Sequence, residues 1–336
     1  MKAQLTQSVI RCVISKYKAV QTVLENETYR IRSNGKTFAF KKNLNWLQHP
    51  IRFLSPQADL VRGRDFSFLN DGILSVATMK GRAKVKFAVR KESRIFDKTW
   101  KIGGAKLLRK GDDWFLHISV TKQYPDVTVS DISDVVGMDR GLVNLVTERD
   151  KNKTSYHPGK EIAKTRAKFD RLRASMQKKG TKGAKRVLKR ISGRENRWME
   201  NVNHTLSKTL VEKYHEHTLF AIEDLSGISF DPENLSSRNA DGRHALRNWS
   251  FYSFEKKLQY KAMMSGNMLV KFDPQYSSQR CPACGHICKD SRNHGRHEYV
   301  CVRCGTKFND DEVAGYNLRT LGLLYLAGEN DPHFSK

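Results

Sequence analysis

Two Cys-x-x-Cys pairs near the end of the chain constrain its fold more than any other feature. Cys281 is paired with Cys284, and Cys301 with Cys304, with sixteen residues between the pairs and a glycine directly after each. This spacing is typical of structural zinc sites, in which two tight turns present four thiolates to one tetrahedral Zn2+. We therefore predict a zinc ribbon. Because the protein would fill all four positions, this zinc would be structural rather than catalytic.

Other side chains in the same part of the chain could replace one of these ligands. They are Cys288, His286, His294 and His297. The symmetric set of four cysteines is the simpler solution, and the spacing argues against four unligated thiols. Five of the six cysteines lie in this part of the chain. In a reducing compartment such clustering favours metal binding over disulfides.

The chain carries a large excess of positive charge. Lys and Arg number 61 and Asp and Glu 35, which gives a net charge of +26. This excess suits a polyanionic partner, DNA or RNA, through phosphate neutralisation and counterion release. The alternatives are a basic protein without such a partner and one bound to an anionic membrane, but the sequence has no lipidation signal or basic amphipathic anchor. Without a signal peptide or a membrane-spanning apolar run, we expect a cytoplasmic protein.

Residues 160–197 concentrate this charge, with fifteen Lys or Arg and three acids. Two helices broken at 180–183 fit this stretch best, because apolar residues from Phe169 to Val202 supply a packing stripe. The alternative is a solvated or disordered run of charge. We expect a packed helix pair whose basic outer face lies along a nucleic-acid backbone. The residues expected to contact nucleic acid are Arg171, Arg173, Lys185, Arg186, Lys189, Arg190, Arg194 and Arg197.

The first third of the chain changes from a helical to a strand pattern. Apolar residues recur at near-helical spacing over residues 3–25. From about residue 27 to 122, Gly-rich turns separate short stretches that alternate basic and apolar residues, as in a sheet with one wet, positive face. We predict a small β-barrel or sandwich there, with strands that include 28–32, 37–40, 83–89 and 114–120.

Three acids stand at the ends of predicted secondary-structure elements. Asp139 ends a β-branched strand that turns at Gly141, Glu223 ends the strand 218–222, and Asp311 begins the last helix. Each has a simpler explanation, namely a solvent-facing turn or an acid that complements a helix dipole. If the three converge, two Mg2+ or Mn2+ ions about 3.5–4 Å apart would equip them for phosphodiester hydrolysis. Oxygen ligands suit Mg2+, in contrast to the thiolates of the zinc site.

Further elements are predicted around these acids. A third strand near 154–157 would follow the Asp139 hairpin. A loop rich in Ser, Asn and Gly over 225–242 is long enough to be a lid or a substrate-contacting loop. A helix with an apolar stripe from Leu246 to Ala262, most simply a core-packing stripe, precedes a strand over 268–272.

In its ordered motifs the chain resembles the TnpB (OrfB) family, whose members are transposon-encoded relatives of the type V CRISPR effectors. The resemblance runs from about Trp114 to Leu326, and the ordered set of motifs is quite specific. It rests on Gly137-x-Asp139-x-Gly141, on Ile222-Glu223-Asp224-Leu225, on a four-cysteine ribbon introduced by Ser277-Ser278-Gln279-Arg280-Cys281, and on an acid-rich helix start.

The resemblance implies both a fold and an activity. The fold is an α/β RNase H-like (RuvC) nuclease domain with an inserted zinc ribbon, preceded by a mainly β, barrel-like domain with a helical segment. The activity is RNA-guided cleavage of DNA next to a short flanking motif, with guide RNA and DNA as partners. The implied boundaries are a helical segment over 1–26, a barrel or wedge-like domain over 27–128, the nuclease domain over 129–276 and 309–336, and the ribbon over 277–308.

The catalytic residues of the family can be carried over one by one. Asp139 matches the first catalytic acid and Glu223 the second. A count from Cys304 places Asp311 on the third position. These three carboxylates would be the ligands of the catalytic Mg2+ or Mn2+.

The third motif and the start of the chain depart from the family pattern. Asn309, Asp310 and Val313 stand where the pattern has Asp, Arg and Asn, and Asp310 is a possible substitute for Asp311. The chain opens at what resembles the middle of the helical insertion. We therefore expect either impaired recognition of the flanking motif or a start codon that has been misassigned.

Three functional hypotheses follow from the sequence. The first is a metal-dependent, RNA-guided DNA endonuclease of a mobile element. The second is a nuclease-impaired relative that binds guide RNA and DNA without cutting. The third is a transposase or junction resolvase on the same fold, which would bind structured DNA without RNA. The sequence does not indicate an oligomeric state.

Overall fold

A computed structural model describes residues 3–26, 29–33, 36–41, 43–53, 56–69, 72–89, 97–141, 143–225, 251–293 and 295–335. Apart from Leu225, the loop predicted over 225–242 lies outside the described residues, as does the start of the helix that follows it. The chain forms two compact units, residues 1–123 and 124–336. No helix among the described residues is both long and apolar enough to cross a membrane.

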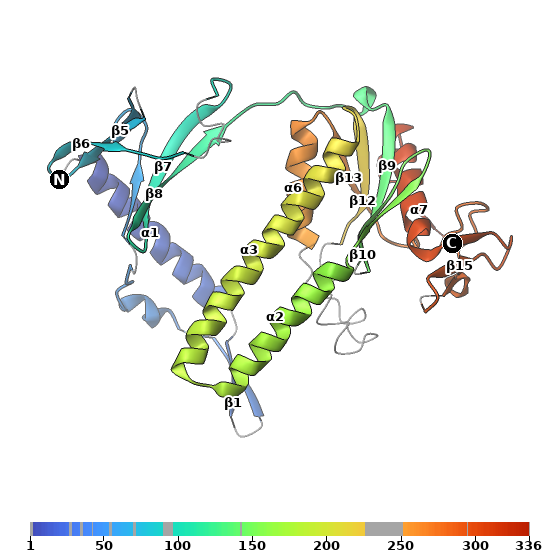
Figure 1. Ribbon diagram of the computed structural model, residues 1–336, viewed down its shortest axis with the longest axis horizontal. Helices are drawn as coiled ribbons and strands as arrows, with labels where there is room; N and C mark the ends of the chain where they lie inside the picture. Colours follow the sequence, from blue (N-terminus) through green and yellow to red (C-terminus); the bar gives the residue numbers. More distant parts are fainter. Residues whose placement is uncertain are drawn as a thin grey trace. The chain divides into compact units, whose positions relative to one another are not determined.

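The first unit begins with a helix and continues as strands (Figure 1). The elements are α1 (Ala3–Asn26), β1 (Tyr29–Ser33), β2 (Lys36–Phe40), the short helical turn η1 (Leu44–Gln48), β3 (Gln57–Leu60), β4 (Phe66–Phe68), β5 (Ile73–Thr78), β6 (Gly81–Lys86), β7 (Lys101–Lys110) and β8 (Asp113–Thr121). They make three antiparallel sheets, ordered β1-β2, β3-β7-β8 and β4-β5-β6. Over the described residues these sheets do not join into a closed barrel, so the barrel stays a prediction.

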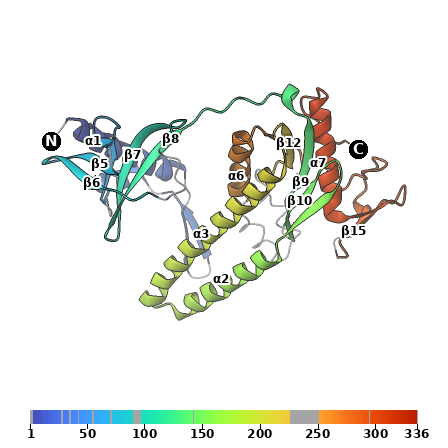
Figure 2. The same ribbon diagram turned by 45° about the horizontal axis from the view of Figure 1, so that its top comes forward.

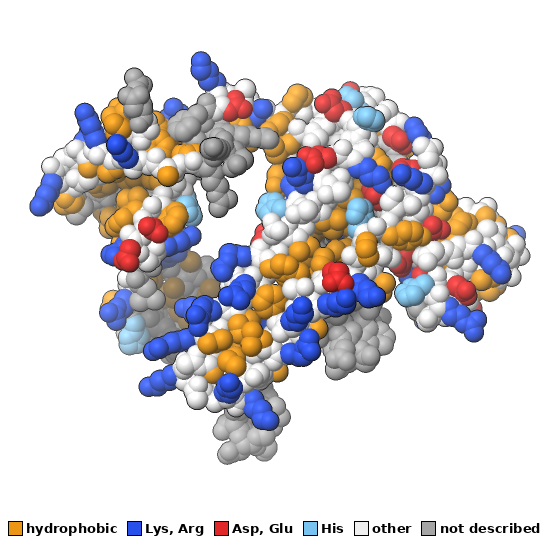
Figure 3. Space-filling view, viewed as in Figure 1, with side chains coloured by type: hydrophobic (Ala, Val, Ile, Leu, Met, Phe, Trp, Pro, Cys, Tyr) orange, Lys and Arg blue, Asp and Glu red, His pale blue; other side chains and the backbone are white. Residues whose placement is uncertain are grey.

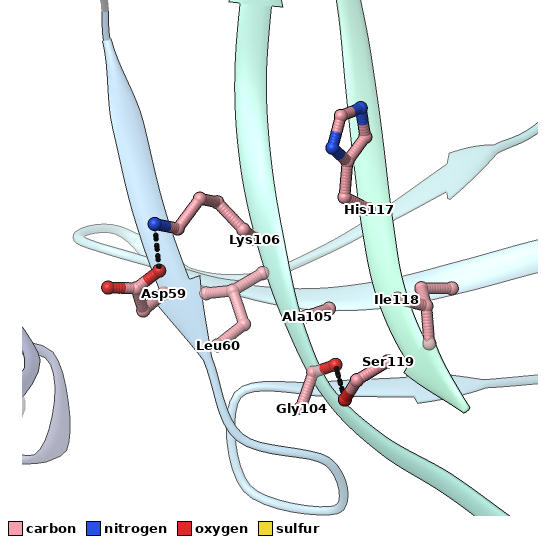
Figure 4. A pocket seen from close by; sticks show the side chains of 8 residues that line it. All are labelled: Asp59, Leu60, Gly104, Ala105, Lys106, His117, Ile118 and Ser119. Carbon is pink, nitrogen blue, oxygen red and sulfur yellow. Dashed lines mark hydrogen bonds and ion pairs between the residues drawn. The ribbon is translucent and has the colours of Figure 1, made fainter. Parts of the chain in front are cut away.

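A small apolar core joins the two three-stranded sheets of this unit. Phe66, Leu74 and Ala105 are buried against one another, and α1 packs on them. On the β3-β7-β8 sheet, Lys106 Nζ lies 3.3 Å from Asp59 Oδ1 (Figure 4). The basic residues of β6 are exposed. Apolar side chains of β4, β5 and β7 therefore build the interior, whereas β6 and β8 also carry exposed apolar side chains such as Val85 and Trp114.

The second unit is built on a five-stranded mixed sheet with helices on both faces (Figures 1 and 2). A short turn, η3 (Val129–Asp131), precedes the sheet. The strands are β9 (Asp134–Asp139), β10 (Asn144–Arg149), β11 (Thr154–Pro158), β12 (Thr218–Glu223) and β13 (Met268–Phe272), and the helices are α2 (Lys160–Lys179), α3 (Lys182–Lys213), α6 (Phe251–Met264) and α7 (Asp310–Leu326). The strand order is β11-β10-β9-β12-β13. β9 is antiparallel to β10 and parallel to β12, and β12 is parallel to β13. The predicted α/β class is confirmed.

The two covered faces explain the unbroken apolar runs of the central strands. Along β9, Val136 and Met138 pack with α3 and α6, whereas Val135 packs with α7. β12 alternates in the same way, with Phe220 on the first face and Leu219 on the second. This period-2 alternation determines which face each strand-end residue points to.

The helix pair α2–α3 forms where the sequence predicts it. α2 ends at Gly180, which has the left-handed φ of 64° that glycine adopts readily at a helix C-terminus. Thr181 then caps α3, because its hydroxyl accepts a hydrogen bond from the Ala184 amide (3.2 Å). These two residues give the predicted break between the helices.

The cysteine-rich segment folds as a small module around Tyr299. Its elements are the turn η4 (Lys289–Ser291) and the strands β14 (Arg292–Asn293), β15 (Glu298–Val300) and β16 (Lys307–Asn309), paired antiparallel in that order. Tyr299 is fully buried with Cys281, Cys301 and Val313. Val313 belongs to α7, so the module packs directly on the helix that follows it.

Candidate active site and zinc-binding site

The two acids at the strand ends lie side by side. β9 and β12 pair in parallel with Met138 opposite Ile222, and Asp139 and Glu223 are the next residues on each strand. Neighbouring strands lie about 4.8 Å apart. Met138 and Ile222 point toward α3 and α6. Because side chains alternate along a strand, both acids point to the opposite face, where α7 lies.

Asp311 reaches the same edge of the sheet from the first turn of α7. Asn309 caps this helix, since its side-chain oxygen accepts a hydrogen bond from the Asp311 amide (3.0 Å). Asn144, at the start of β10, donates a side-chain hydrogen bond to Asp311 Oδ2 (2.7 Å). The structure therefore brings together the three acids that were singled out in the sequence.

A close backbone approach between β9 and α7 supports this geometry. A Cβ atom on Gly137 would lie 2.0 Å from the carbonyl oxygen of Gly315 and 2.5 Å from the amide nitrogen of Arg319. No side chain fits in that space, so glycine is required. Gly137 thus lets α7 lie directly on β9, two residues before Asp139.

Burial disfavours the charged state of both Asp139 and Glu223, and at Asp139 the neighbouring carboxylates add to this effect. Burial, followed by the charges of Glu223 and Asp311, raises the pKa of Asp139 well above its ordinary value, against the opposing effects of Arg292 and the Arg140 amide. Burial also raises the pKa of Glu223, against a hydrogen bond from Ser277 and the charges of Arg140 and Arg292. A cluster of this kind gains stability from a bound cation.

The cysteine-rich module holds the Glu223 carboxylate in place. Ser277 Oγ donates a hydrogen bond to Glu223 Oε1 (2.6 Å). Asn317 of α7 fixes the backbone of the segment that carries this serine, because its Nδ2 donates to the carbonyl oxygens of Ser277 and Arg280, both at 2.7 Å. Glu223 is therefore oriented by a residue from outside the sheet.

Asp310, the alternative third acid, has different partners. It is almost fully buried, and its Oδ2 lies 3.3 Å from Arg292 Nε. Its Oδ1 lies 3.4 Å from His297 Nδ1. Arg292 also reaches Asp311 Oδ1, at 3.8 Å. The charge of Asp311 is among the causes that raise the pKa of Asp139, whereas His297, Asp310 and Asp311 form a group of possible metal ligands of their own.

The residues of this cluster fit a divalent cation of the Mg2+ class. Three carboxylates supply oxygen donors, which such hard cations prefer. Burial raises the pKa of Asp139 and of Glu223, and the charges of Glu223 and Asp311 raise that of Asp139 further, so a bound cation would favour the ionised form of both acids. Two hydrogen-bond donors, Asn144 and Ser277, hold two of the carboxylates in fixed orientations.

The four cysteines predicted as zinc ligands lie together. Cys281 Sγ is 3.7 Å from Cys304 Sγ, and Cys284 Sγ is 3.6 Å from Cys301 Sγ. All four sulfur atoms lie within 4.8 Å of one another. With Zn–S bonds of about 2.3 Å, a tetrahedral site separates its sulfurs by about 3.8 Å. The observed separations match this value and are far longer than a disulfide bond, so the cluster indicates structural zinc.

Two similar turns present these thiolates. The amide of Gly285 donates to the carbonyl of Cys281 (2.9 Å), and that of Gly305 to the carbonyl of Cys301 (2.8 Å). Both glycines have a φ near 70°, a conformation that other residues rarely adopt. Without metal, hydrogen bonds from Thr306 lower the pKa of Cys304 to about 6, whereas burial raises the pKa of Cys281 to about 12. Zinc binding requires the thiolate form of each ligand.

The other potential zinc ligands do not join this group. Cys288, His286 and His297 are described, and none of them belongs to the four-cysteine cluster. His294 lies outside the described residues. The geometry therefore favours the four cysteines alone as the zinc ligands.

Seven of the eight basic residues expected to contact nucleic acid are exposed on the helix pair. Figure 3 shows Lys and Arg side chains on both sides of a band of apolar atoms along the hairpin. Arg173 differs from the others. It is half-buried and lies 2.7 Å from Glu195 of α3 and 3.1 Å from Asp170. Arg173 therefore links α2 to α3, while the other seven remain available to a partner.

Sequence reasoning missed the residues that support the acids. Asn144 donates a hydrogen bond to Asp311, and Ser277 donates one to Glu223. Arg292 contacts both Asp310 and Asp311. Ser277 lies within the motif that introduces the cysteine pairs, and Asn144 follows Asp139 by five residues. Both positions were visible in the sequence, but no local pattern relates either of them to an acid on another element.

Two family models match parts of the chain. Residues 117–226 match a model described as a probable transposase, OrfB_IS605. Residues 251–318 match a model described as the Cas12f1-like TNB domain. The two matches cover most of the second unit, which includes the three acids and the four cysteines.

Curated proteins with related sequences agree with these models. The chain is 28% identical over 241 residues to the CRISPR-associated endodeoxyribonuclease Cas12f1 of Sulfoacidibacillus thermotolerans, covering 67% of this chain and 54% of that protein. It is 25% identical over 265 residues to the TnpB-like protein MJ0751 of Methanocaldococcus jannaschii, covering 75% and 91%. The putative RNA-guided DNA endonuclease InsQ of Escherichia coli is 25% identical over 232 residues, covering 64% and 55%. The chain spans about half the length of the first and third relatives.

A solved structure shares the fold. The mini-RNA-guided endonuclease CRISPR-Cas_phi3 aligns with a TM-score of 0.52 at 10% identity, covering 77% of this chain and 58% of that one. The motifs, the family models and the relatives agree with one another. The chain therefore belongs to the OrfB/TnpB family of transposases and carries a Cas12f1-like TNB domain built around its four clustered cysteines.

Proposed function

We propose that this chain is a metal-dependent, RNA-guided DNA endonuclease of a mobile element. The observation that carries the proposal is the convergence of Asp139, Glu223 and Asp311 at one edge of the mixed sheet. The strand order, with β9 central and β12 and β13 parallel to it, supports an RNase H-like (RuvC) nuclease domain over residues 129–276 and 309–336. Relatives named as RNA-guided or CRISPR-associated endonucleases support the reaction type.

The three acids would act as ligands of two Mg2+ or Mn2+ ions. When bound, such a pair of ions activates the attacking water and stabilises the leaving oxygen of a phosphodiester. The chain's own part is to hold the carboxylates ready. Asn144 orients Asp311, Ser277 orients Glu223, and pairing with Thr147 of β10 fixes the backbone of Asp139.

The basic surfaces would hold the nucleic acids. The exposed Lys and Arg of α2–α3 are suited to the phosphates of a guide RNA paired with DNA, a duplex that a protein reads by its shape rather than its sequence. The sheets of the first unit, assigned here as the wedge-like domain over 27–128 with its helical segment over 1–26, offer a second basic surface. The zinc module over 277–308 supports the acid site.

A guided cleavage assay tests the proposal. The protein is purified with its bound RNA, the RNA is sequenced, and double-stranded DNA that matches it is offered with and without added Mg2+. We expect cutting only with Mg2+ and only of matched DNA. Asp139→Ala should abolish it, whereas Asp126→Asn, an exposed acid outside the cluster, should not.

Other outcomes would identify the other two hypotheses. Tight binding to matched DNA without cutting, over several divalent metals, would indicate a relative that blocks access to DNA. Cutting of structured DNA by protein that carries no RNA would indicate a transposase or junction resolvase. Either result would overturn guided cleavage as the function.

A further inference from the structure

Among the described residues, Arg140 is the most deeply buried cation near the acid cluster. A charged substrate in solvent could not reach it. Its side chain has an exposed fraction of 0%. It directly follows Asp139, so by the alternation of the strand it points to the opposite face of the sheet, toward α6. The guanidinium lies 5.9 Å from the ring centre of Phe251, the first residue of α6. This arginine lies beneath the acids rather than among them.

The contacts of this guanidinium join three elements. Arg140 Nη1 lies 3.2 Å from Glu255 Oε2 of α6. Arg140 Nη2 donates a hydrogen bond to the main-chain carbonyl of Glu223, at the end of β12. Glu255 Oε1 lies 3.6 Å from Lys271 Nζ, which in turn lies 3.2 Å from Asp224 Oδ1. The network runs along the carboxyl ends of β9, β12 and β13.

The position of Arg140 coincides with the end of a hydrogen-bond ladder. β9 and β12 are paired up to Met138 and Ile222, and no pairing between the two strands is described beyond that point. On the outer sides, Asp139 is still paired with β10, and Glu223 is still paired with β13. The two acids are therefore each fixed to an outer neighbour, while Arg140 supplies the link between them.

A neutral side chain would fill this space without the desolvation that a buried guanidinium suffers. Such a neutral side chain would not make the hydrogen bond that Arg140 donates to the Glu223 carbonyl. We propose that Arg140 is a positioning residue that sets the separation of the Asp139 and Glu223 carboxylates, with Glu255 as its counterion. This inference rests on the proposed function, because the acids are taken to be metal ligands.

The expected effect is on metal affinity. Residues that orient metal ligands typically change metal affinity or activity by about 10- to 100-fold when removed. Arg140→Met should therefore raise the Mn2+ dissociation constant of the acid cluster, and the Mg2+ concentration for half-maximal cutting, by about that factor. In Arg140→Lys, the single ammonium group replaces the planar guanidinium that contacts both Glu255 and the Glu223 carbonyl. Its Mn2+ affinity should therefore lie between those of the parent and Arg140→Met.

A paired substitution separates positioning from mere stability. Arg140→Met alone leaves Glu255 buried without its guanidinium and should lower the melting temperature. The double variant Arg140→Met/Glu255→Met removes both charges, so its melting temperature should return toward that of the parent. Because the link to the Glu223 carbonyl is still missing, its Mn2+ affinity should remain as weak as in Arg140→Met.

The readout is Mn2+ binding by electron paramagnetic resonance on the full, zinc-loaded chain. Asp139→Asn serves as the control that removes the acid-cluster signal. A double variant with restored melting temperature and weak Mn2+ binding supports the proposal. A double variant that binds Mn2+ as tightly as the parent overturns it, since Arg140 would then serve folding alone. If the parent binds Mn2+ but does not cut DNA, the proposed function fails while this comparison still decides the role of Arg140.

Discussion

The two metal sites inferred for this chain are built in opposite ways. The zinc ligands are cysteines in two local turns, and backbone hydrogen bonds within each turn position their sulfur atoms. The three acids come from β9, β12 and α7, elements that are far apart in the sequence and meet only because the sheet and α7 pack together. The zinc site is therefore a local property of one segment, and the acid site is a property of the whole second unit.

This difference predicts how each site responds to change. The zinc cluster depends mainly on its thiolates and on left-handed glycines, so changes in those residues should affect it most. The acid cluster depends on strand pairing, on Gly137 and on Ser277 and Arg292 of the zinc module. We infer that damage to zinc binding will reach the acids, whereas damage to the acids will leave zinc bound.

The largest expected effect is loss of cutting on removal of one acid. Asp139→Asn, Glu223→Gln and Asp311→Asn should each reduce guided DNA cleavage by about 1,000-fold or more, as expected for residues that act as a unit. Zinc content, measured by mass spectrometry, should stay at one ion per chain. Asp126→Asn is the matched exposed control. An Asp311→Asn variant that cuts normally, beside an inactive Asp310→Asn variant, would reverse the assignment of the third acid.

Disruption of the zinc cluster should come next in size. Cys301 is buried in the cluster, so Cys301→Ser should lose zinc and unfold the module. Because Ser277 would no longer hold Glu223, cutting should also fall steeply, by roughly 100-fold. Cys288→Ser, outside the cluster, is the control and should keep both zinc and activity. Full activity in zinc-free Cys301→Ser would show that the acids do not depend on the module.

Gly137→Ala tests the packing that brings α7 to the acids. The added methyl would overlap the Gly315 carbonyl, so we expect a loss of about 1–3 kcal/mol in the free energy of unfolding, with reduced cutting. Urea unfolding provides the measurement. Gly183→Ala, in the first turn of α3, would place its Cβ 3.9 Å from Thr181 Oγ1, an ordinary contact, and should be neutral or slightly stabilising. Equal stability of the two variants would show that β9 and α7 are not in close contact.

The acid cluster should make stability depend on pH. The pKa of Asp139 is raised in the folded state, so the folded chain binds its proton more tightly than the unfolded chain does. Without added Mg2+, this acid therefore destabilises the fold above its raised pKa, and the penalty is relieved as the pH falls toward about 4, the ordinary carboxyl value. Asp139→Asn should melt higher than the parent at pH 8, by about 2–4 °C for each kcal/mol of relieved desolvation and repulsion.

This difference in melting temperature should shrink as the pH is lowered to 5 or as Mg2+ is added at pH 8. Scanning calorimetry of the parent and Asp139→Asn under both conditions provides the comparison. A gap that is the same at pH 5 and pH 8 would show that the pKa of Asp139 is not raised by burial and by its neighbouring carboxylates.

The smallest effects are expected on the helix pair. Lys189→Ala should weaken RNA binding uniformly across sequences and reduce the slope of log affinity against log salt by about 1. Arg173→Ala should instead lower the melting temperature, because Arg173 bridges α2 to Glu195 of α3. Filter binding at several salt concentrations distinguishes the two. A salt slope that changes only for Arg173→Ala would reverse their roles.

The local elements of this fold could be predicted from the sequence. The break between α2 and α3 follows from Gly180 and Thr181, and the turns of the zinc module follow from the cysteine spacing. The strands that end at Asp139 and Glu223 follow from continuous apolar runs. In each case, residues adjacent in the chain determine the structure.

The contacts between distant elements could not be predicted in this way. Nothing in the sequence around Ser277 indicates that its hydroxyl contacts Glu223, 54 residues earlier. The buried pair of Arg140 and Glu255 is equally hidden, because it depends on where α6 crosses the sheet. The closed N-terminal barrel remains a prediction, since closure depends on strand pairings beyond those described.

Anomalous diffraction from crystals soaked in Mn2+ would test the central claim most directly. Data collected at the zinc edge should give a peak within the four cysteines, which serves as an internal control. Data at the manganese edge should give peaks between the carboxylates of Asp139, Glu223 and Asp311, and these should vanish in Asp139→Asn. A clear zinc peak with no manganese density at the three acids would contradict the claim that they form one metal site.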